Sequence, residues 1–422
     1  MAQVFILLVI MLILGVPIAY AIGLAATYGL LFVGHVPLTV VPQRMYTMLD
    51  TFSLLAIPFF VLAGNLMEKG GISRKLIAFA NSIVGHIKGG LGMVDILSCM
   101  LFGAISGSGA AASAAIGGIC IPEMRKQGYD KEFAGAITAV SGPLGIIIPP
   151  SVVMVIYATT ANVSVGSMFM AGYLPGILIG LLMMVTVYFV AKKKGYPAGK
   201  RATFKQFVHT TFDAIWAIFM IVIIMGGIFS GFFTATEAAC VSVVYALLVG
   251  FFIYKELKVK DLVGILVSSV KTSAGIMFCV ATTNILAWLM TSQNIAASVA
   301  AAMNSAIHGK VLMMIVINII YLILGTFLDS TPAIILSVPV LLPLAQQFGI
   351  DPVHFGIITT VNLAIGMSTP PVGITLFVSS KIADTSLTSM VKPMVPLWGI
   401  MIAALMLITF YPPISMLLVN LL

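Results

Sequence analysis

One acidic residue of this chain stands where a charge is unexpected. Asp329 lies in Gly325-Thr326-Phe327-Leu328-Asp329-Ser330-Thr331, between apolar runs at 311–326 and 332–347. If those runs lie in a membrane, the carboxylate is costly and is a candidate functional group by default. A helix cap is its structural alternative, because Thr331-Pro332 is typical of a helix start. The two roles are compatible.

Two apolar segments are each interrupted by a Pro-Pro pair. They read Gly145-Ile146-Ile147-Ile148-Pro149-Pro150 and Gly366-Met367-Ser368-Thr369-Pro370-Pro371. In a helix each proline removes a donor, so the carbonyls of Gly145, Ile146, Gly366 and Met367 lose the partner four residues on. In hydrocarbon these oxygens need a neighbouring helix, water or a bound cation. Cation binding by unwound backbone is typical of secondary transporters.

Small and hydroxyl residues surround both breaks. With no carboxylate in reach of the first break, hydroxyl and carbonyl oxygens favour Na⁺ over Ca²⁺. Two sodium sites and a substrate region between them are therefore predicted, the alternative being close packing of helices by small residues. The first site comprises Ser106, Gly107, Ser108, Ser141, Gly142, Gly145 and Ile148, and the second Gly325, Asp329, Ser330, Thr331, Gly366, Met367, Ser368 and Thr369. The substrate region comprises Ser108, Ser113, Ser151, Thr331, Thr369 and Gly373.

Two further acids stand in apolar surroundings. Asp95 lies in an apolar run, where an ion pair with a base would satisfy it, and Glu237 follows Thr234 and Thr236, which indicates helix capping. The four cysteines are isolated and have no metal-ligand spacing, which indicates buried small hydrophobic residues. No phosphate-binding Gly-rich loop with its Lys and no nucleophile elbow is present, so neither a built-in ATPase nor a membrane enzyme is expected.

Composition places these residues in a membrane. The 422 residues are 60% hydrophobic and 8% charged, with a mean hydropathy of +1.15. Continuous apolar runs such as 215–229 indicate a polytopic α-helical protein and exclude a β-barrel. The net charge of +8 is spread over short loops, which indicates membrane orientation and no nucleic-acid partner. Lys192 to Lys194, Lys200, Arg201 and Lys205 place their loop in the cytoplasm.

The chain is also internally duplicated. Gly145 and Gly366, the two Pro-Pro pairs, and Asp130 and Asp351 are each separated by 221 residues. We therefore expect a first repeat at 1–191, a cytoplasmic basic linker at 192–212 and a second repeat at 213–422.

Each repeat is predicted to carry one helical hairpin and one broken helix. The hairpins span 88–126 and 311–347, and the broken helices span 133–160 and 354–380. Bases at both ends of the first hairpin place its entry in the cytoplasm, whereas the second hairpin should enter from outside. The repeats should therefore have inverted topology, with both tips and both breaks near one midplane site. Residues 3–33 are expected to form one crossing, kinked near Gly15 and Pro17.

The chain resembles a known family along essentially its whole length. The resemblance rests on Ala63-Gly64-Asn65-Leu66-Met67, Ser106-Gly107-Ser108, Gly142-Pro143 with Ile148-Pro149-Pro150-Ser151, Phe233-Thr234-Ala235-Thr236-Glu237-Ala238-Ala239, Phe327-Leu328-Asp329 with Thr331-Pro332, and Thr369-Pro370-Pro371-Val372-Gly373. These strings are similar to those of the large membrane subunit of tripartite ATP-independent periplasmic (TRAP) transporters.

The resemblance implies a sodium-driven elevator carrier of the bacterial inner membrane. It implies at least two Na⁺ ions, a small membrane subunit of about four helices and a periplasmic substrate-binding protein as partners. It also implies a carboxylate substrate, with sialic acid favoured and a C4-dicarboxylate as the other choice. Helix N-termini after Pro150 and Pro371 would present positive dipole ends to that carboxylate. A stand-alone sodium/dicarboxylate symporter, which needs no binding protein, is the nearest alternative.

Overall fold

The computed structural model describes residues 1–307 and 309–421, without the side chains of residues 296, 300 and 304–306. This part of the chain is helical, and its one β-bridge joins Lys88 and Ala198. Among the described residues, eight helices are long and apolar enough to span a bilayer. A ninth span is counted if Lys131–Ile147 and Val152–Ala161, which meet at an angle of 45°, are one broken helix. The predicted all-α membrane protein is confirmed.

The helices of the first half precede the basic connection. They are α1 (Ala2–Ile13), α2 (Ile18–Phe32), α3 (Val40–Leu49), a 3-10 turn (Phe52–Leu55), α4 (Ala56–Lys69), α5 (Ile72–Val84), α6 (Gly90–Ser106), α7 (Gly109–Lys126), α8 (Lys131–Ser141), α9 (Leu144–Ile147), α10 (Val152–Ala161) and α11 (Val165–Lys194).

The second half follows the same order. Its helices are α12 (Phe204–Phe229), α13 (Ala235–Leu248) with a π-helical extension (Val249–Ile253), α14 (Val259–Ser292), α15 (Ile295–Ala306), α16 (Lys310–Phe327), α17 (Ser330–Gln347), α18 (Pro352–Met367), α19 (Ile374–Ala383), α20 (Leu387–Phe410) and α21 (Pro413–Met416), with a last 3-10 turn (Val419–Leu421).

The internal duplication is visible in the helix boundaries. Helices α7 and α17 begin and end 221 residues apart, and each is the second arm of a hairpin. The broken helix is α8 to α10 in the first half and α18 with α19 in the second. The long helix α14 corresponds to α3, the 3-10 turn and α4 together, so this segment is continuous in one half and interrupted in the other. Two repeats with a hairpin and a broken helix each are thus present.

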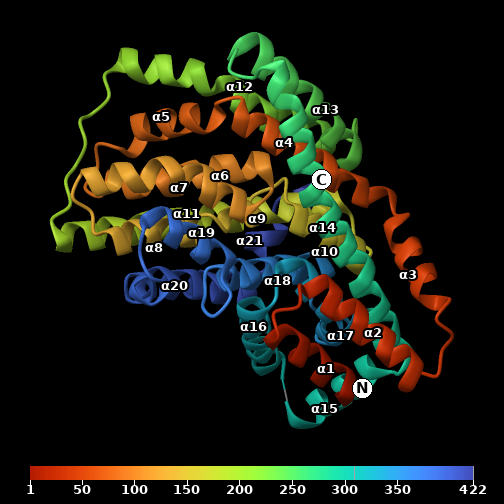
Figure 1. Cartoon of the computed structure of the whole chain (residues 1–422). Helices are drawn as coiled ribbons and strands as arrows, with labels where there is room; N and C mark the ends of the chain where they lie inside the picture. The colour runs from red at the N-terminus through yellow and green to blue at the C-terminus, as the bar shows by residue number, and fades with distance from the viewer. Residues whose placement is uncertain (308, 422) are drawn as a thin grey trace.

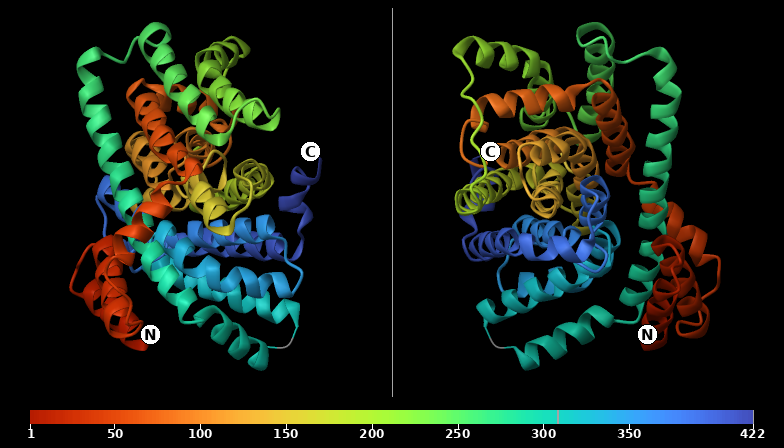
Figure 2. Two further views of the ribbon diagram at one scale, coloured as in Figure 1. Left: turned by 90° about the vertical axis from the view of Figure 1, so that its right-hand side faces the viewer. Right: turned by 60° about the vertical axis from the view of Figure 1, so that its left-hand side comes forward.

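The hairpins and broken helices of both halves form one body, with α11 and α20 packed beside them (Figure 1). Helices from the two halves are interleaved in this body. Helix α19 of the second half packs against α7 and α8 of the first, and α10 of the first half packs against α17 and α18 of the second. Helix α14 runs along this body as one long rod (Figure 2). It contacts α2, α3 and α4, and it links the α12–α13 end of the molecule to the α1–α2 end (Figure 1).

The prediction of one kinked crossing at residues 3–33 is wrong. Helices α1 and α2 fold back on each other, so that a Cβ atom at Gly29 would lie 2.8 Å from a methyl group of Val4. Gly15 adopts the left-handed conformation with φ of 79°, and Pro17 cannot continue the preceding helix, so the chain reverses there. The pair α1 and α2 is therefore the counterpart of α12 and α13.

The connection between the halves is held against the first hairpin. Helix α11 continues to Lys194 and α12 begins at Phe204, so only part of the predicted linker at 192–212 is non-helical. Tyr196 stacks on Tyr129 with ring centroids 4.2 Å apart. Hydrogen bonds from Lys194 and from the Tyr196 hydroxyl lower the pKa of the Asp130 carboxyl. The connection is therefore packed on the helical body at its start.

Candidate functional site

The tip of the first hairpin is a glycine turn followed by a capped helix. Gly107 ends α6 in the left-handed conformation with φ of 62°. Ser108 then caps α7, since its hydroxyl accepts a hydrogen bond from the Ala111 N–H at 3.4 Å. The Gly107 carbonyl also accepts from the Val152 N–H of α10 at 3.4 Å. The tip is thus joined to the chain just after the first Pro-Pro break.

The tip of the second hairpin is built from an acidic cap. Asp329 caps α17, with its Oδ1 accepting from the Ser330 N–H at 2.8 Å, as the sequence predicted for a helix start. The side chain of Asp329 remains exposed at this tip. The Thr326 carbonyl accepts from the Val372 N–H at 3.3 Å, which joins this tip to the second break. Asp329 is therefore both a cap and an accessible carboxylate.

Glycine pairs bring each hairpin into backbone contact with its broken helix. A Cβ atom at Gly103 would lie 2.3 Å from the Gly145 Cα, and one at Gly366 would lie 2.5 Å from the Gly325 Cα. Real Cβ atoms do not approach backbone so closely, so both contacts require glycine. The predicted site residues Gly145, Gly325 and Gly366 lie at these contacts.

Most of the carbonyl oxygens freed by the prolines accept hydrogen bonds from hydroxyl or N–H groups of the protein. Ser151, the cap of α10, donates to the Ile146 carbonyl at 2.7 Å. Thr375 of α19 donates to the Met367 carbonyl at 2.9 Å, and the Gly366 carbonyl accepts from the Thr369 N–H at 2.9 Å. Three of the four carbonyls therefore have a protein donor.

Both hairpin tips line one cavity of about 360 Å³. Ser106, Gly107 and Ser108 come from the first tip and Asp329, Ser330 and Thr331 from the second, and Met367 also lines the cavity. The hydroxyls of Ser106 and Ser330 are buried and have no hydrogen-bond partner among the described residues. The volume suits a small organic molecule.

Four helices begin at this cavity. Gly109, Val152, Ser330 and Ile374 all line it, and they are the first residues of α7, α10, α17 and α19. Each of these helices has at least ten residues. A helix N-terminus offers unpaired N–H groups and the positive end of the helix dipole. Four of them around one space favour a bound anion.

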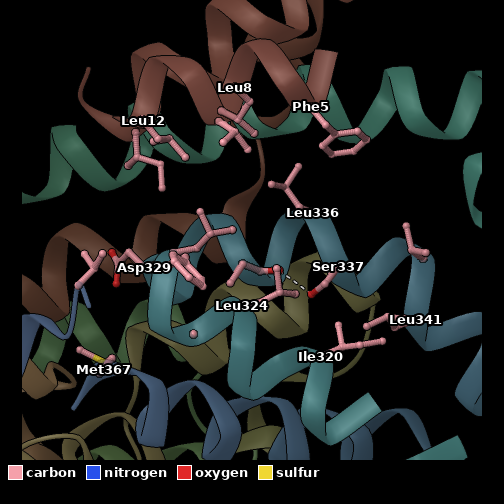
Figure 3. Close-up of a pocket in the computed structure, with 18 of the residues that line it drawn as sticks. Phe5, Leu8, Leu12, Ile320, Leu324, Asp329, Leu336, Ser337, Leu341 and Met367 are labelled. Carbon is pink, nitrogen blue, oxygen red and sulfur yellow. Dashed lines mark hydrogen bonds between the residues drawn. The ribbon is translucent and has the colours of Figure 1, made fainter. Parts of the chain in front are cut away.

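A larger cavity of about 1000 Å³ adjoins the second hairpin. Figure 3 shows Phe5, Leu8 and Leu12 of α1 on one side of it and Leu336 on the other. Apart from Asp329 and Ser337, the described lining side chains are apolar. Asp329, Met367 and Ile374 line both cavities, so Asp329 lies where an apolar and a polar space meet.

Several predicted site residues lie away from the smaller cavity's lining. Ser141 donates to the buried Asp95 carboxylate at 2.6 Å, so a carboxylate lies nearer this segment than the sequence indicated. Ser113 packs against Gly142, and the Ile148 side chain packs at Gly176 of α11. Trp398 donates to the Ser368 hydroxyl at 3.1 Å, and the Thr369 hydroxyl donates to the Ile365 carbonyl at 2.7 Å. Gly373 lines the larger cavity.

Two polar residues outside the hairpins complete the cavity and were not predicted as site residues. Asn65 of α4 and Thr272 of α14 both line it. The Asn65 amide donates to the Ser269 hydroxyl of α14 at 2.8 Å, which ties the two helices together. The sequence does contain a feature that could have identified Asn65 as a site residue. It is an amide in the otherwise apolar helix 56–69, and a polar group in a membrane needs a partner.

Comparison with known proteins agrees with this architecture. The family model described as "Tripartite ATP-independent periplasmic transporter, DctM component" matches residues 5–414. The chain is 40% identical over 377 residues to the C4-dicarboxylate TRAP transporter large permease protein DctM of Pseudomonas aeruginosa, covering 89% of this chain and 88% of that protein. It is 37% identical over 404 residues to the sialic acid TRAP transporter large permease protein SiaM of Vibrio cholerae, covering 96% and 95%. The crystal structure of the YdaH transporter of Alcanivorax borkumensis superposes with a TM-score of 0.63 at 12% identity, covering 89% of this chain and 87% of that chain.

Proposed function

The chain belongs to the DctM component family of tripartite ATP-independent periplasmic transporters, and from this premise we propose that its 360 Å³ cavity binds a small carboxylate during sodium-coupled uptake. The protein is a multi-pass permease of the bacterial inner membrane and is not an enzyme. The convergence of four helix N-termini on the cavity carries the proposal.

The carboxylate is proposed to bind between the two hairpin tips. The N–H groups at the starts of α7 and α17 neutralise part of its charge, as do those at the starts of α10 and α19. Asn65 and Thr272, which also line the cavity, supply neutral hydrogen-bonding groups. We favour a C4-dicarboxylate or sialic acid, because the relatives named above carry these substrates in their names.

Sodium is proposed to bind at each hairpin tip. Asp329 would repel a substrate carboxylate unless a cation stood between them, and the unpartnered Ser330 hydroxyl lies beside it. At the first tip, the Ser106 hydroxyl is free to coordinate a cation. Na⁺ at these positions would assemble the tips before the substrate binds, which couples its gradient to uptake.

An elevator movement is proposed to carry the site across the membrane. The two hairpins and broken helices pack into one body, and α4 and α14 border the cavity from outside that body. The body would slide against these helices with substrate and sodium bound. As in other members of a tripartite family, a small membrane subunit would brace the static helices and a periplasmic binding protein would deliver the substrate.

Uptake into liposomes tests the proposal. The chain would be reconstituted with its small membrane subunit, and labelled sialic acid and a C4-dicarboxylate would be offered with or without the binding protein and an inward sodium gradient. We expect uptake of one substrate to require both. Uptake with sodium alone would indicate the stand-alone symporter, and sodium-independent uptake would contradict the coupling.

Asp329→Asn is the variant that tests the proposed sodium site most directly in this assay. Loss of the carboxylate removes a charged sodium ligand, so we expect sodium-driven uptake to fall by at least about tenfold, corresponding to about 1.4 kcal/mol. Asp384→Asn is the matched control, because Asp384 ends α19 away from the cavity and Asn tolerates its left-handed backbone. Equal uptake by both variants at every sodium concentration would exclude Asp329 from the site.

A further inference from the structure

The larger cavity has no role in the proposed transport site, although it adjoins the second hairpin. Helix α1 forms one wall of it, and α16 and α17 form the other (Figure 3). On α1 the lining residues include Phe5, Leu8 and Leu12, and on α16 they include Ile320 and Leu324. Residues three or four positions apart share one face of a helix. Each wall therefore presents an apolar stripe to a space of about 1000 Å³.

The cavity opens onto the apolar surface of the protein. Ile13 of α1 and Phe327 of α16 line it and are also exposed. Ile6 and Ile10, on the remaining surface of α1, are exposed as well. In a membrane protein such a surface faces the hydrocarbon of the bilayer. Lipid chains therefore have direct access to the cavity.

Water is a poor occupant of this space. Asp329 and Ser337 are the polar side chains among the described lining residues, and Asp329 lies at the border with the smaller cavity. The Ser337 hydroxyl already lies 2.5 Å from the Ala333 carbonyl and 3.1 Å from the Tyr321 hydroxyl. A buried water needs two to four polar partners, and apolar cavities stay dry. Most of the cavity offers water no partner.

The transported anion and a partner helix fit the cavity no better. A carboxylate would lose its hydration there without meeting a side-chain donor over most of the lining, which is costly. A helix about 10 Å wide that crosses about 30 Å of hydrocarbon occupies about 2400 Å³, more than twice the space available. The remaining occupant is hydrocarbon from the bilayer.

We propose that the larger cavity binds the acyl chains of one membrane phospholipid. A methylene group takes about the volume of a water molecule, roughly 30 Å³, so about 30 of them fit, as many as two acyl chains carry. The chains enter past Ile13 and Phe327 and give the lining side chains the contacts that an empty space would deny them. Because the chains are fluid, they stay in contact with the second hairpin as it moves, a role that rests on the proposed function.

Tryptophan fluorescence of the full complex in nanodiscs tests the proposal. The nanodiscs contain phospholipids with either brominated or plain acyl chains, and bromine quenches a tryptophan that it touches. We expect the emission added by Leu336→Trp to be lost with brominated chains. Two positions of α11 are the controls: exposed Phe189→Trp should lose its emission equally, and buried Phe169→Trp should retain it. Leu8→Trp reports from the opposite wall if Leu336→Trp does not fold.

Each other outcome overturns the proposal. Quenching of either reporter by aqueous iodide would show that water fills the cavity. Reporters that neither iodide nor brominated chains quench would show that protein closes the cavity in the assembled complex. Quenching by a brominated free fatty acid, without quenching by the brominated phospholipid, would identify a single-chain ligand instead. Because the readout does not require transport, failure of sodium-coupled uptake would not affect it.

Discussion

At the scale of single residues, the helical body depends on positions where a side chain cannot fit. Gly103 meets Gly145 and Gly325 meets Gly366, and in each case the neighbour is backbone that cannot rotate away. Gly145, Gly325 and Gly366 were predicted as members of the two sodium sites, whereas Gly103 was not. The structure shows that all four are required for close packing of each hairpin against its broken helix.

Gly366→Ala should therefore destabilise the protein. The added Cβ would lie 2.5 Å from the Gly325 Cα, and overpacking of this kind costs about 1–3 kcal/mol. Gly399→Ala is the matched control, because it lies in helix α20 with no atom within 4 Å of the added Cβ. Thermal unfolding of both variants in detergent measures the difference. Equal melting temperatures would show that the contact between α16 and α18 accommodates the added methyl group without loss of stability.

At the scale of elements, each broken helix is stabilised by a hydroxyl that follows the prolines. Ser151 donates to a carbonyl on the other side of its break, and so does Thr375. Thr375 also lies 2.8 Å from the Ala139 carbonyl of α8, so it joins the two repeats. A proline break in a membrane thus has its polar groups satisfied by a residue a few positions on.

Thr375→Val should lower stability while keeping the shape of the side chain. It removes the single hydroxyl proton that the buried carbonyls of Ala139 and Met367 share, at a cost of about 1–3 kcal/mol. Thr375→Ser keeps the hydroxyl and should unfold close to the wild-type temperature. Unfolding of all three proteins by heat gives the comparison. A Ser variant as unstable as the Val variant would show that the Thr375 hydroxyl does not by itself account for the stability.

At the scale of the whole molecule, the elevator movement predicts which crosslinks block transport. A Cβ at Gly64 of α4 would lie 3.3 Å from the Ser106 Cβ at the first tip, and a Cβ at Gly135 would lie 3.0 Å from the Ala383 Cβ within the helical body. Both separations are near the range of about 3.5–4.5 Å found in disulfides.

Oxidised Gly64→Cys with Ser106→Cys should stop the uptake that remains in the Ser106→Cys single variant, and a reductant should restore uptake to that variant's level, because the bond fastens the moving body to α4. Oxidised Gly135→Cys with Ala383→Cys should still transport, since both positions move together. Uptake is measured before and after oxidation in both double variants, with each single-cysteine variant as a control. Unchanged uptake by the first oxidised pair would contradict the movement, and so would reversible blockage by the second.

Much of this architecture follows from the sequence alone, for local reasons. Continuous apolar runs require helices in a membrane, and a proline removes a backbone donor wherever it stands, so both breaks were predicted at their observed places. The 221-residue offset likewise identified the paired hairpins before any contact was known. Capping by Glu237 is also local, and the structure confirms it, with the carboxylate accepting from the Thr234 N–H at 2.8 Å.

Only the tertiary structure decided what these elements meet. The starts of α7, α10, α17 and α19 are far apart in the chain, and their convergence on one cavity depends on helix packing. The pairing of Ser141 with Asp95 spans 46 residues, so no local pattern revealed it. The fold-back of α1 on α2 was missed because Gly and Pro permit both a kink and a reversal, and packing of Val4 on Gly29 selects the reversal.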